Sequence, residues 1–182
     1  MSQTRSIAVL VGSLRKESFN RQFAHALLKL LPADCKAEFI RIDDLPLYSQ
    51  DDDASPAPAV TRLRQSIKAA SGVLFVTPEY NRSIPGVLKN AIDHGSRPWG
   101  QSVWAGKPAA VAGVSGGPIG ASMAQQHLRN VLAFLNMPTL PGHEMFIHWK
   151  EGLVVDGAIG AASKDFVQGF VNDFAAWVRK FS

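Results

Sequence analysis

The chain has 182 residues, of which 46% are hydrophobic and 19% are charged. These values predict one folded domain over residues 1–182 and exclude a mainly disordered chain, because the apolar content is high enough to build a core. The net charge of +4 comes from Lys and Arg residues scattered along the chain, a pattern that argues against a nucleic-acid-binding track and favours a small anionic ligand.

Strands and helices are predicted in alternation. Uninterrupted aliphatic runs are typical of strands buried on both faces, and apolar residues three or four apart are typical of helices. The predicted strands cover residues 7–11, 37–42, 72–77, 107–114 and 144–148. The predicted helices cover residues 19–31, with Ser18 as N-cap and Pro32 as the stop, 58–70, a segment with Pro85 as its first residue, 122–135 and 162–181, and 43–55 is predicted to be a polar loop.

This order of elements predicts the fold class. Parallel strands joined by right-handed helical crossovers build a three-layer α/β/α sandwich. Five strands favour a flavodoxin-like, doubly wound five-stranded parallel sheet in the order 2-1-3-4-5 over a six-stranded dinucleotide-binding fold. Trp99 and Trp104 are expected in the core, and the alternative for each is a place beside the ligand pocket or in a dimer contact. The last helix is predicted to turn one apolar stripe inward, made of Phe166, Phe170, Phe174, Trp177, Val178 and Phe181.

Other features bear on compartment, membranes and metals. The chain has one cysteine, Cys35, predicted to be a small core residue or a thiol at a helix end. No apolar run approaches the roughly 20 residues that span a bilayer, and the first residues lack the apolar segment of a signal peptide. We therefore expect a cytoplasmic protein without a membrane anchor. The five histidines have no metal-ligand spacing, so no metal site is expected.

The predicted topology indicates where a ligand would bind. In an open parallel sheet, ligands lie beyond the carboxyl ends of the strands, where the strand order reverses. In the predicted order this point falls between the first and third strands. The loop after Gly12 and the loop after Thr77 should therefore be neighbours.

The first loop, which begins at Gly12, runs directly into a helix whose N-terminus attracts anions. Ser13, Ser18 and Asn20 add neutral donors, and Arg15 adds a charged group suited to phosphate. The loop lacks the glycine patterns of dinucleotide and nucleoside triphosphate sites, which favours a single terminal phosphate. The alternative interpretation is that Ser18 only caps the helix and Arg15 is a surface charge.

Two further loops offer surfaces for a flat ligand. In residues 77–86, two prolines stiffen the backbone, Tyr80 offers an aromatic surface, and Glu79 and Asn81 face a ligand or cap the next helix. The alternative there is a proline-bounded turn before a helix. Residues 114–120 are rich in glycine, which lets a backbone approach a flat ligand closely.

Two motifs resemble a known family. They are Gly12-Ser13-Leu14-Arg15 with Ser18-Phe19-Asn20, and Pro78-Glu79-Tyr80-Asn81 with Pro85-Gly86-Val87-Leu88-Lys89-Asn90-Ala91-Ile92-Asp93. With them the chain resembles the NADPH-dependent FMN reductase family over nearly its whole length, and within it the bacterial chromate and quinone reductases. The resemblance implies non-covalent FMN, NADPH or NADH as co-substrate, two-electron reduction of quinones, chromate or other electrophilic acceptors, and a homodimer or homotetramer.

The resemblance also assigns residues to the flavin. Those that it implies are Ser13, Arg15, Ser18, Phe19 and Asn20 in the first loop, Pro78, Glu79, Tyr80 and Asn81 beside the flavin ring, and Ser115, Gly116 and Gly117 on its other side. No catalytic acid or base is assigned, because the hydride chemistry belongs to the flavin. NAD(P)H and the acceptor are expected to use one face of the site in turn, in a ping-pong cycle.

Asn81 and Arg97 are the candidate substrate-binding residues. Arg97 follows the helix that Pro85 starts, where its charge would attract anionic acceptors or the phosphate of NADPH. The alternative is a charge that stabilises the end of that helix. The main alternative function is a flavodoxin-like electron carrier or a flavin-binding signalling protein that does not turn over NAD(P)H. Carrier flavodoxins tend to be acidic, so the positive net charge and Arg15 favour the reductase.

Overall fold

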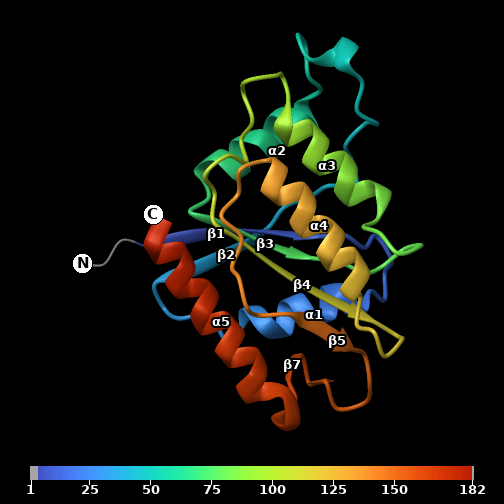
Figure 1. Cartoon of the computed structure of the whole chain (residues 1–182), viewed down its shortest axis with the longest axis vertical. Helices are drawn as coiled ribbons and strands as arrows, with labels where there is room; N and C mark the ends of the chain where they lie inside the picture. The colour runs from blue at the N-terminus through green and yellow to red at the C-terminus, as the bar shows by residue number, and fades with distance from the viewer. Residues whose placement is uncertain (1–3, 182) are drawn as a thin grey trace.

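A five-stranded parallel sheet forms the centre of the computed structural model, which describes residues 4–181 (Figure 1). The strands are β1 (Arg5–Val11), β2 (Cys35–Phe39), β3 (Gly72–Val76), β4 (Ala109–Ser115) and β5 (Met145–His148). Their order in the sheet is β2-β1-β3-β4-β5, and every neighbouring pair is parallel. This order confirms the predicted flavodoxin-like topology.

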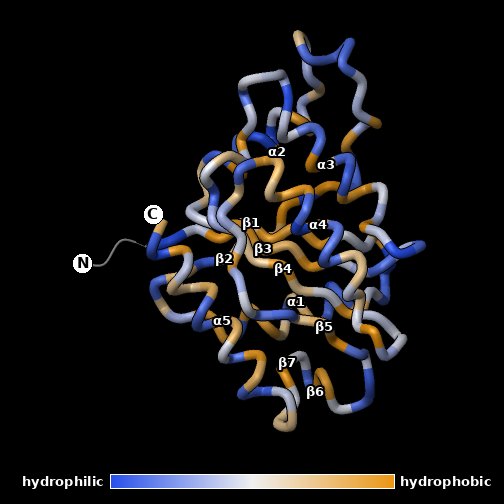
Figure 2. Tube along the Cα trace, in the orientation of Figure 1, coloured by the Kyte–Doolittle hydropathy of each residue, from blue (hydrophilic) through white to orange (hydrophobic). Residues whose placement is uncertain are grey.

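Helices cover both faces of this sheet and complete the three layers. They are α1 (Phe19–Leu28), α2 (Pro58–Ala69), α3 (Gly86–Ser96), α4 (Ser122–Phe134) and α5 (Ala161–Phe181), with a short 3-10 helix at Gln50–Asp52. One core cluster lies between the sheet and α1 and α5, and a second lies between the sheet and α2, α3 and α4. Figure 2 shows the hydrophobic strands at the centre of the molecule.

The central strands owe their position to their aliphatic sequences. All residues of β3, the last five of β1 and the first six of β4 are buried. In contrast, the edge strands β2 and β5 each have a single buried residue. Burial of apolar surface on both sides is the main stabilising contribution to such a sheet, so the three runs that the sequence marks as strands take its central places.

Several element boundaries differ from the predictions, and three of the differences have a structural reason. Strand β2 lies earlier than the predicted residues 37–42, because its pairing with β1 ends at the Val9 and Phe39 partners. Helix α1 ends at Leu28, and the next residues form single turns that still pack on the core. Pro85 is the N-cap of α3 and not its first helical residue, since its ψ of 146° is extended.

A short hairpin that was not predicted precedes α5. Its strands are β6 (Val154–Val155) and β7 (Ala158–Ile159). Asp156 and Gly157 form its turn with φ of 49° and 68°, the left-handed values of a type I′ turn. An Asp-Gly pair is a strong hairpin signal, so the sequence held the information for this element.

Some aromatic residues are placed differently from the predictions. Trp104 is fully buried, as predicted, and its Nε1 donates to Ile92 O at 2.9 Å. The prediction for Trp99 is wrong, because its side chain is 80% exposed in the turn after α3. On α5, Phe166 and Phe181 are exposed. The buried stripe of α5 is made of Val167, Phe170, Val171, Phe174, Ala175 and Val178, so Phe166 lies beside it, and Phe181 is the last residue of the helix.

The remaining predictions on core and membrane can also be compared with the structure. Cys35 is buried in the cluster under α1 and α5, which agrees with a small core residue. Burial raises the pKa of its thiol. Within residues 4–181, no helix is both long enough and apolar enough to span a membrane.

Candidate functional site

The three candidate loops meet at the carboxyl edge of the sheet, on the right-hand side of Figure 1. Gly12 N donates to Val76 O at 2.9 Å, and Thr77 N donates to Ala112 O at 2.9 Å. A Cβ on Gly12 would lie 3.2 Å from Thr77 Oγ1 and from the side chain of Leu88, so the first and second loops touch. The expectation that these loops are neighbours is confirmed.

The first loop presents donors to an anion. Ser18 is the N-cap of α1 and its Oγ accepts from Arg21 N at 3.2 Å, which leaves the hydroxyl hydrogen free to donate. The first turn of α1 has no acidic residue, so the positive end of the helix is not neutralised. Ser13 is buried beside this turn, and the Arg15 side chain is exposed at its rim. These features favour a phosphate.

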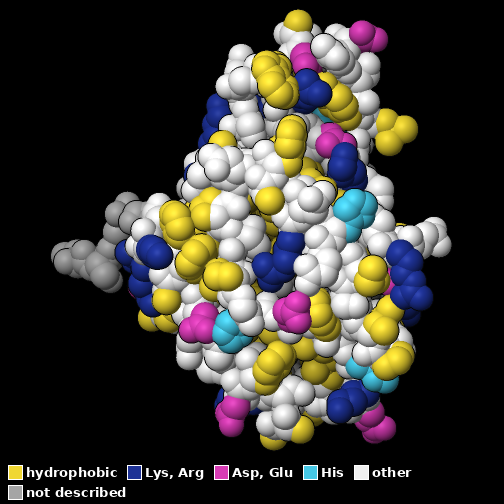
Figure 3. Space-filling view, in the orientation of Figure 1, with side chains coloured by type: hydrophobic (Ala, Val, Ile, Leu, Met, Phe, Trp, Pro, Cys, Tyr) yellow, Lys and Arg dark blue, Asp and Glu magenta, His cyan; other side chains and the backbone are white. Residues whose placement is uncertain are grey.

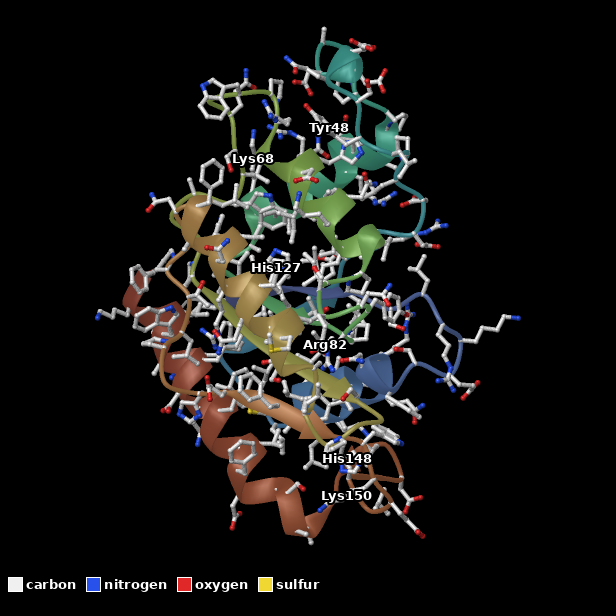
Figure 4. All side chains as sticks on the ribbon, turned by 45° about the vertical axis from the view of Figure 1, so that its right-hand side comes forward. Tyr48, Lys68, Arg82, His127, His148 and Lys150 are labelled. Carbon is white, nitrogen blue, oxygen red and sulfur yellow. The ribbon has the colours of Figure 1, made fainter. Side chains whose placement is uncertain are left out.

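An aromatic stack forms the floor next to this loop. Phe19 stacks on Trp149 with a centroid distance of 4.4 Å and an interplanar angle of 11°, and the guanidinium of Arg15 lies 5.0 Å from the Phe19 centroid. Trp149 N donates to Ser115 O at 2.8 Å, at the end of β5. The sequence analysis missed Trp149, although the residue after the fifth strand must lie at the same edge as the other loops. Figure 4 labels its neighbours His148 and Lys150 there.

Asn20 joins two layers instead of offering a free amide. Its Nδ2 donates to Val114 O at 2.8 Å, and its Oδ1 accepts from Val114 N at 2.9 Å. Both polar atoms of this buried side chain therefore bind the backbone of β4, the strand that leads into the glycine-rich loop. The side chain therefore has a positioning role, because its amide is already satisfied within the protein, and a contact of Asn20 with the phosphate stays a prediction.

The second loop contains a tight turn. Tyr80 and Ser83 exchange two backbone hydrogen bonds of 2.9 and 3.0 Å, and Asn81 and Arg82 between them have φ of 51° and 66°. Two left-handed central residues define a type I′ turn. Asn tolerates this conformation, whereas a left-handed Arg costs roughly 1 kcal/mol or more, so contacts around the turn must hold it. Tyr80 is half exposed at its corner.

The side chain of Glu79 points to α4. Its Oε2 accepts from Met123 N at 2.9 Å and from Ala124 N at 3.2 Å, and its Oε1 pairs with Arg82 Nη1 at 3.2 Å. Of the two roles open to Glu79 in the sequence, helix capping is the one that the side chain performs. The helix is α4, which follows the third loop, and not α3, which follows Glu79 in the chain.

The third loop leaves part of its backbone open to the approach of a ligand. Ser115 Oγ donates to Gly117 O at 3.0 Å and holds the turn. A Cβ on Gly116 or Gly117 would meet nothing within 4 Å, so a flat group can approach this backbone. Gly113, inside β4, is different: its Cβ would lie 2.6 Å from Thr77 O. Glycine is needed there for strand packing.

Arg97 is not brought to these loops within one chain. It is the C-cap of α3, whose other end is at the carboxyl edge, and an 11-residue helix separates the two ends by about 16 Å. The guanidinium lies 5.9 Å from the Tyr48 ring and 5.8 Å from the Trp99 ring. These surroundings fit the alternative interpretation of Arg97, in which it is a cation that stabilises the C-terminus of a helix.

The polar side chains that could hold a metal ion do not cluster. In the part of the chain that the structure describes, residues 4–181, there is no group of three or more His, Cys, Asp or Glu side chains arranged for a metal. The donors at the carboxyl edge are hydroxyl, guanidinium and backbone N–H groups, which suit an anionic organic ligand.

Comparison with known proteins agrees with this geometry. The family model described as NADPH-dependent FMN reductase matches residues 5–151. The chain belongs to this family. It is 51% identical over 176 residues to a 2-hydroxy-1,4-benzoquinone reductase from Burkholderia sp, a match that covers 95% of this chain and 96% of the relative. It is 50% identical over 181 residues to a quinone reductase from Pseudomonas putida, which covers 98% and 97%.

This member of the FMN reductase family also resembles a solved structure in three dimensions. The flavoenzyme NAD(P)H:(acceptor) oxidoreductase FerB from Paracoccus denitrificans superposes with a TM-score of 0.94 at 41% identity, and the match covers 98% of this chain and 99% of FerB. The matched region includes the three loops at the carboxyl edge and the helices around them. The sequence motifs and the tertiary structure therefore identify the same family.

Proposed function

We propose that the protein is an NAD(P)H-dependent quinone reductase that holds FMN non-covalently at the carboxyl edge of the sheet. The observation that carries this proposal is the first loop, where Ser18 retains a free hydroxyl hydrogen at a helix N-terminus without acidic residues, with Arg15 at its rim. The names of the two reductases that are about 50% identical over nearly the whole chain support the same activity.

The flavin would lie across all three loops. Ser13, Arg15 and Ser18 would bind its phosphate. The backbone of the second loop, Pro78 to Asn81, would face the edge of the ring, and the open backbone of Gly116 and Gly117 would allow the ring to approach from the other side. Phe19 would support the phosphate loop through its stack on Trp149.

The residues of the chain bind and orient, and we assign none of them as acid or base. Bound FMN supplies the hydride chemistry, taking two electrons from NADPH or NADH and passing them to a quinone. Half-exposed Tyr80 and its neighbour Asn81 stand at the open side of the turn, where we propose that they contact the nicotinamide and then the acceptor in turn. Chromate and other electrophilic acceptors would use the same open face.

We further propose that two copies of the chain pair through α3 and α4. The groove between these helices is lined by Ile92 and Val131, and Phe134 at its end is 80% exposed. Figure 3 shows the face of the molecule over α3 and α4, where hydrophobic side chains lie among polar ones. A two-fold axis across antiparallel helices would bring the end of α3 in one copy to the start of α3 in the other. Arg97 would then reach the site of the partner copy, where its charge would attract anionic acceptors or the phosphate of NADPH.

Spectroscopy tests the activity directly. The purified protein, supplied with FMN if it is colourless, should show flavin absorption bands that bleach when NADPH is added without oxygen and return when a quinone is added. Bands that do not bleach with NADPH or NADH would favour the electron carrier or signalling protein. Failure to bind FMN would overturn the assignment of the three loops.

A second experiment tests the pairing. Phe134→Asp should convert the oligomer to monomers in analytical ultracentrifugation, because a charge in an apolar interface is strongly unfavourable. Arg97→Ala should raise the Michaelis constants for NADPH and for anionic acceptors. Unchanged constants would remove Arg97 from the site, and an unchanged sedimentation coefficient for Phe134→Asp would exclude this face as the interface.

A further inference from the structure

The start of α4 lacks a cap of its own. Its N-cap position is Ala121, with a left-handed φ of 60°, and no side chain within the local turn accepts from the first amides of the helix. Such amides ordinarily bind a Ser, Thr, Asp or Asn side chain at the N-cap, and they carry the positive end of the helix dipole. An acceptor from elsewhere in the fold is therefore required.

Glu79 supplies this acceptor from the second loop. One carboxylate oxygen accepts from both Met123 N and Ala124 N, and the side chain is only 9% exposed. A carboxylate at this position gains both the hydrogen bonds and the interaction with the dipole. The result is a connection between loops that lie more than 40 residues apart in the sequence.

A second contact lies one helical turn further along α4. Ser83 Oγ and His127 Nδ1 are 2.7 Å apart, so the far side of the type I′ turn is bound to the same helix. Figure 4 labels His127 on α4 and Arg82 in the turn. Arg82 closes the arrangement through its ion pair with Glu79. The turn with its left-handed Asn81 and Arg82 is thereby held at both ends by one rigid element.

We propose that Glu79, Ser83 and His127 form a clasp that fixes the distance between the turn and the glycine-rich loop, and thereby the affinity for the flavin. The glycine-rich loop leads directly into α4, so whatever binds the turn to the start of α4 also sets the spacing across the site. Glu79 is then a positioning residue that acts through α4. This inference rests on the proposed function, because it requires FMN between these two loops.

The chain offers graded variants and a matched control. Glu79→Ala removes the acceptor, and Glu79→Gln keeps an acceptor oxygen without the charge. Glu144→Gln is the control, because Glu144 also binds α4, accepting from Gln126 Nε2 at 2.9 Å, but lies outside the three loops. His127→Ala removes the second contact alone.

Three readouts are measured on the full chain. The FMN dissociation constant, from quenching of flavin fluorescence, should rise about tenfold in Glu79→Ala, the fold-change that corresponds to a lost helix cap. It should rise about threefold in Glu79→Gln and in His127→Ala and stay unchanged in Glu144→Gln. The absorption maxima of bound flavin should shift in Glu79→Ala only. Hydrogen exchange of the Met123 and Ala124 amides, measured without flavin, should accelerate in the same variant.

The outcomes separate this inference from the function on which it rests. If the unaltered protein binds no FMN, both the proposed function and the clasp are overturned. If it binds FMN and Glu79→Ala binds equally tightly with the same spectrum, only the clasp is overturned. A loss in Glu79→Ala that Glu79→Gln partly restores, together with faster exchange at α4, supports the clasp.

Discussion

The two ends of α3 differ in what their polar groups do. At the N-terminal end, beside the carboxyl edge, Glu79 and Ser83 bind α4, and the glycine backbone of the third loop stays open. At the C-terminal end, backbone carbonyl oxygens accept hydrogen bonds from the side-chain donors nearby. Arg64 donates to His94 O, Gly95 O and Gln101 O, and the buried His94 places its Nε2 2.9 Å from Pro46 O.

The difference follows from helix chemistry. A helix C-terminus exposes unpaired carbonyls, which require donors, so cations gathered there are structural by default. The half-buried guanidinium of Arg64 lies among these carbonyls, and burial lowers its pKa. The edges where strands end and helices begin expose N–H groups, which attract an anionic ligand. Within one copy of the chain, a basic residue therefore indicates a ligand at the carboxyl edge, whereas Arg97 would reach a ligand only in the proposed pair of copies.

The largest expected effect separates stability from binding. Trp104→Ala removes a fully buried ring and its bond to Ile92 O at the C-terminal end of α3, so it should lower the free energy of unfolding by about 3 to 5 kcal/mol. Urea denaturation measures this loss. The folded fraction should still bind FMN with an affinity within about twofold of the original, since the site is at the other end. A large loss of FMN affinity would mean that the two ends are coupled.

Arg15→Gln should weaken FMN binding and leave the free energy of unfolding nearly unchanged. Its exposed side chain contributes little to folding, but loss of a charged contact to phosphate should raise the FMN dissociation constant about ten- to hundredfold. Isothermal titration with FMN and with riboflavin checks the cause. The variant should lose its preference for FMN over riboflavin, and a retained preference would place the phosphate elsewhere.

Arg64→Gln is the matched change at the other end of the helix. Shortening a side chain that serves three carbonyls should lower the free energy of unfolding by about 1 to 3 kcal/mol. FMN affinity should not change. Thermal melting with and without FMN measures both quantities, and the stabilisation by FMN should be the same as in the unaltered protein.

The smallest expected effect is a change in stability at the amino edge of the sheet, and it depends on pH. Asp34 binds Arg179 at 2.7 Å and Arg5 at 3.2 Å, and the Arg179 hydrogen bond lowers the pKa of its carboxyl. A lowered pKa means that the stabilisation is present above the ordinary pKa and is lost as the pH falls through the lowered value. Asp34→Asn should therefore be less stable at neutral pH. Melting curves of the two proteins should converge below about pH 4.

Local sequence patterns predicted most of the fold. The runs in β1, β3 and β4 are apolar enough to be central strands whatever surrounds them, and Ser18 caps α1 as its position before a helical pattern predicts. The boundaries that were wrong lie where pairing or packing ends an element. Strand β2 stops where β1 ceases to pair with it, a fact of the sheet and not of residues 35–42.

In the candidate site too, some features were predicted from the sequence and others are visible only in the structure. Motifs placed Ser13, Ser18 and the glycine-rich loop at the carboxyl edge, since loop position follows from topology. The partners of Asn20 and Glu79 were beyond the reach of the sequence, because Val114 and Met123 lie tens of residues away and only the packed fold brings them close. Trp99 was expected in the core, whereas its side chain is exposed in the turn after α3.

By itself, the sequence determined the α/β class, the strand order and which loops share the carboxyl edge, because periodicity, caps and connection handedness act locally and the topology follows from them. Only the tertiary structure decided how the polar side chains are used. Glu79 caps a distant helix, Asn20 binds a strand, and Arg97 ends α3 away from the loops. A buried donor or acceptor takes the nearest partner in space, and nearness in space is a property of the packed chain.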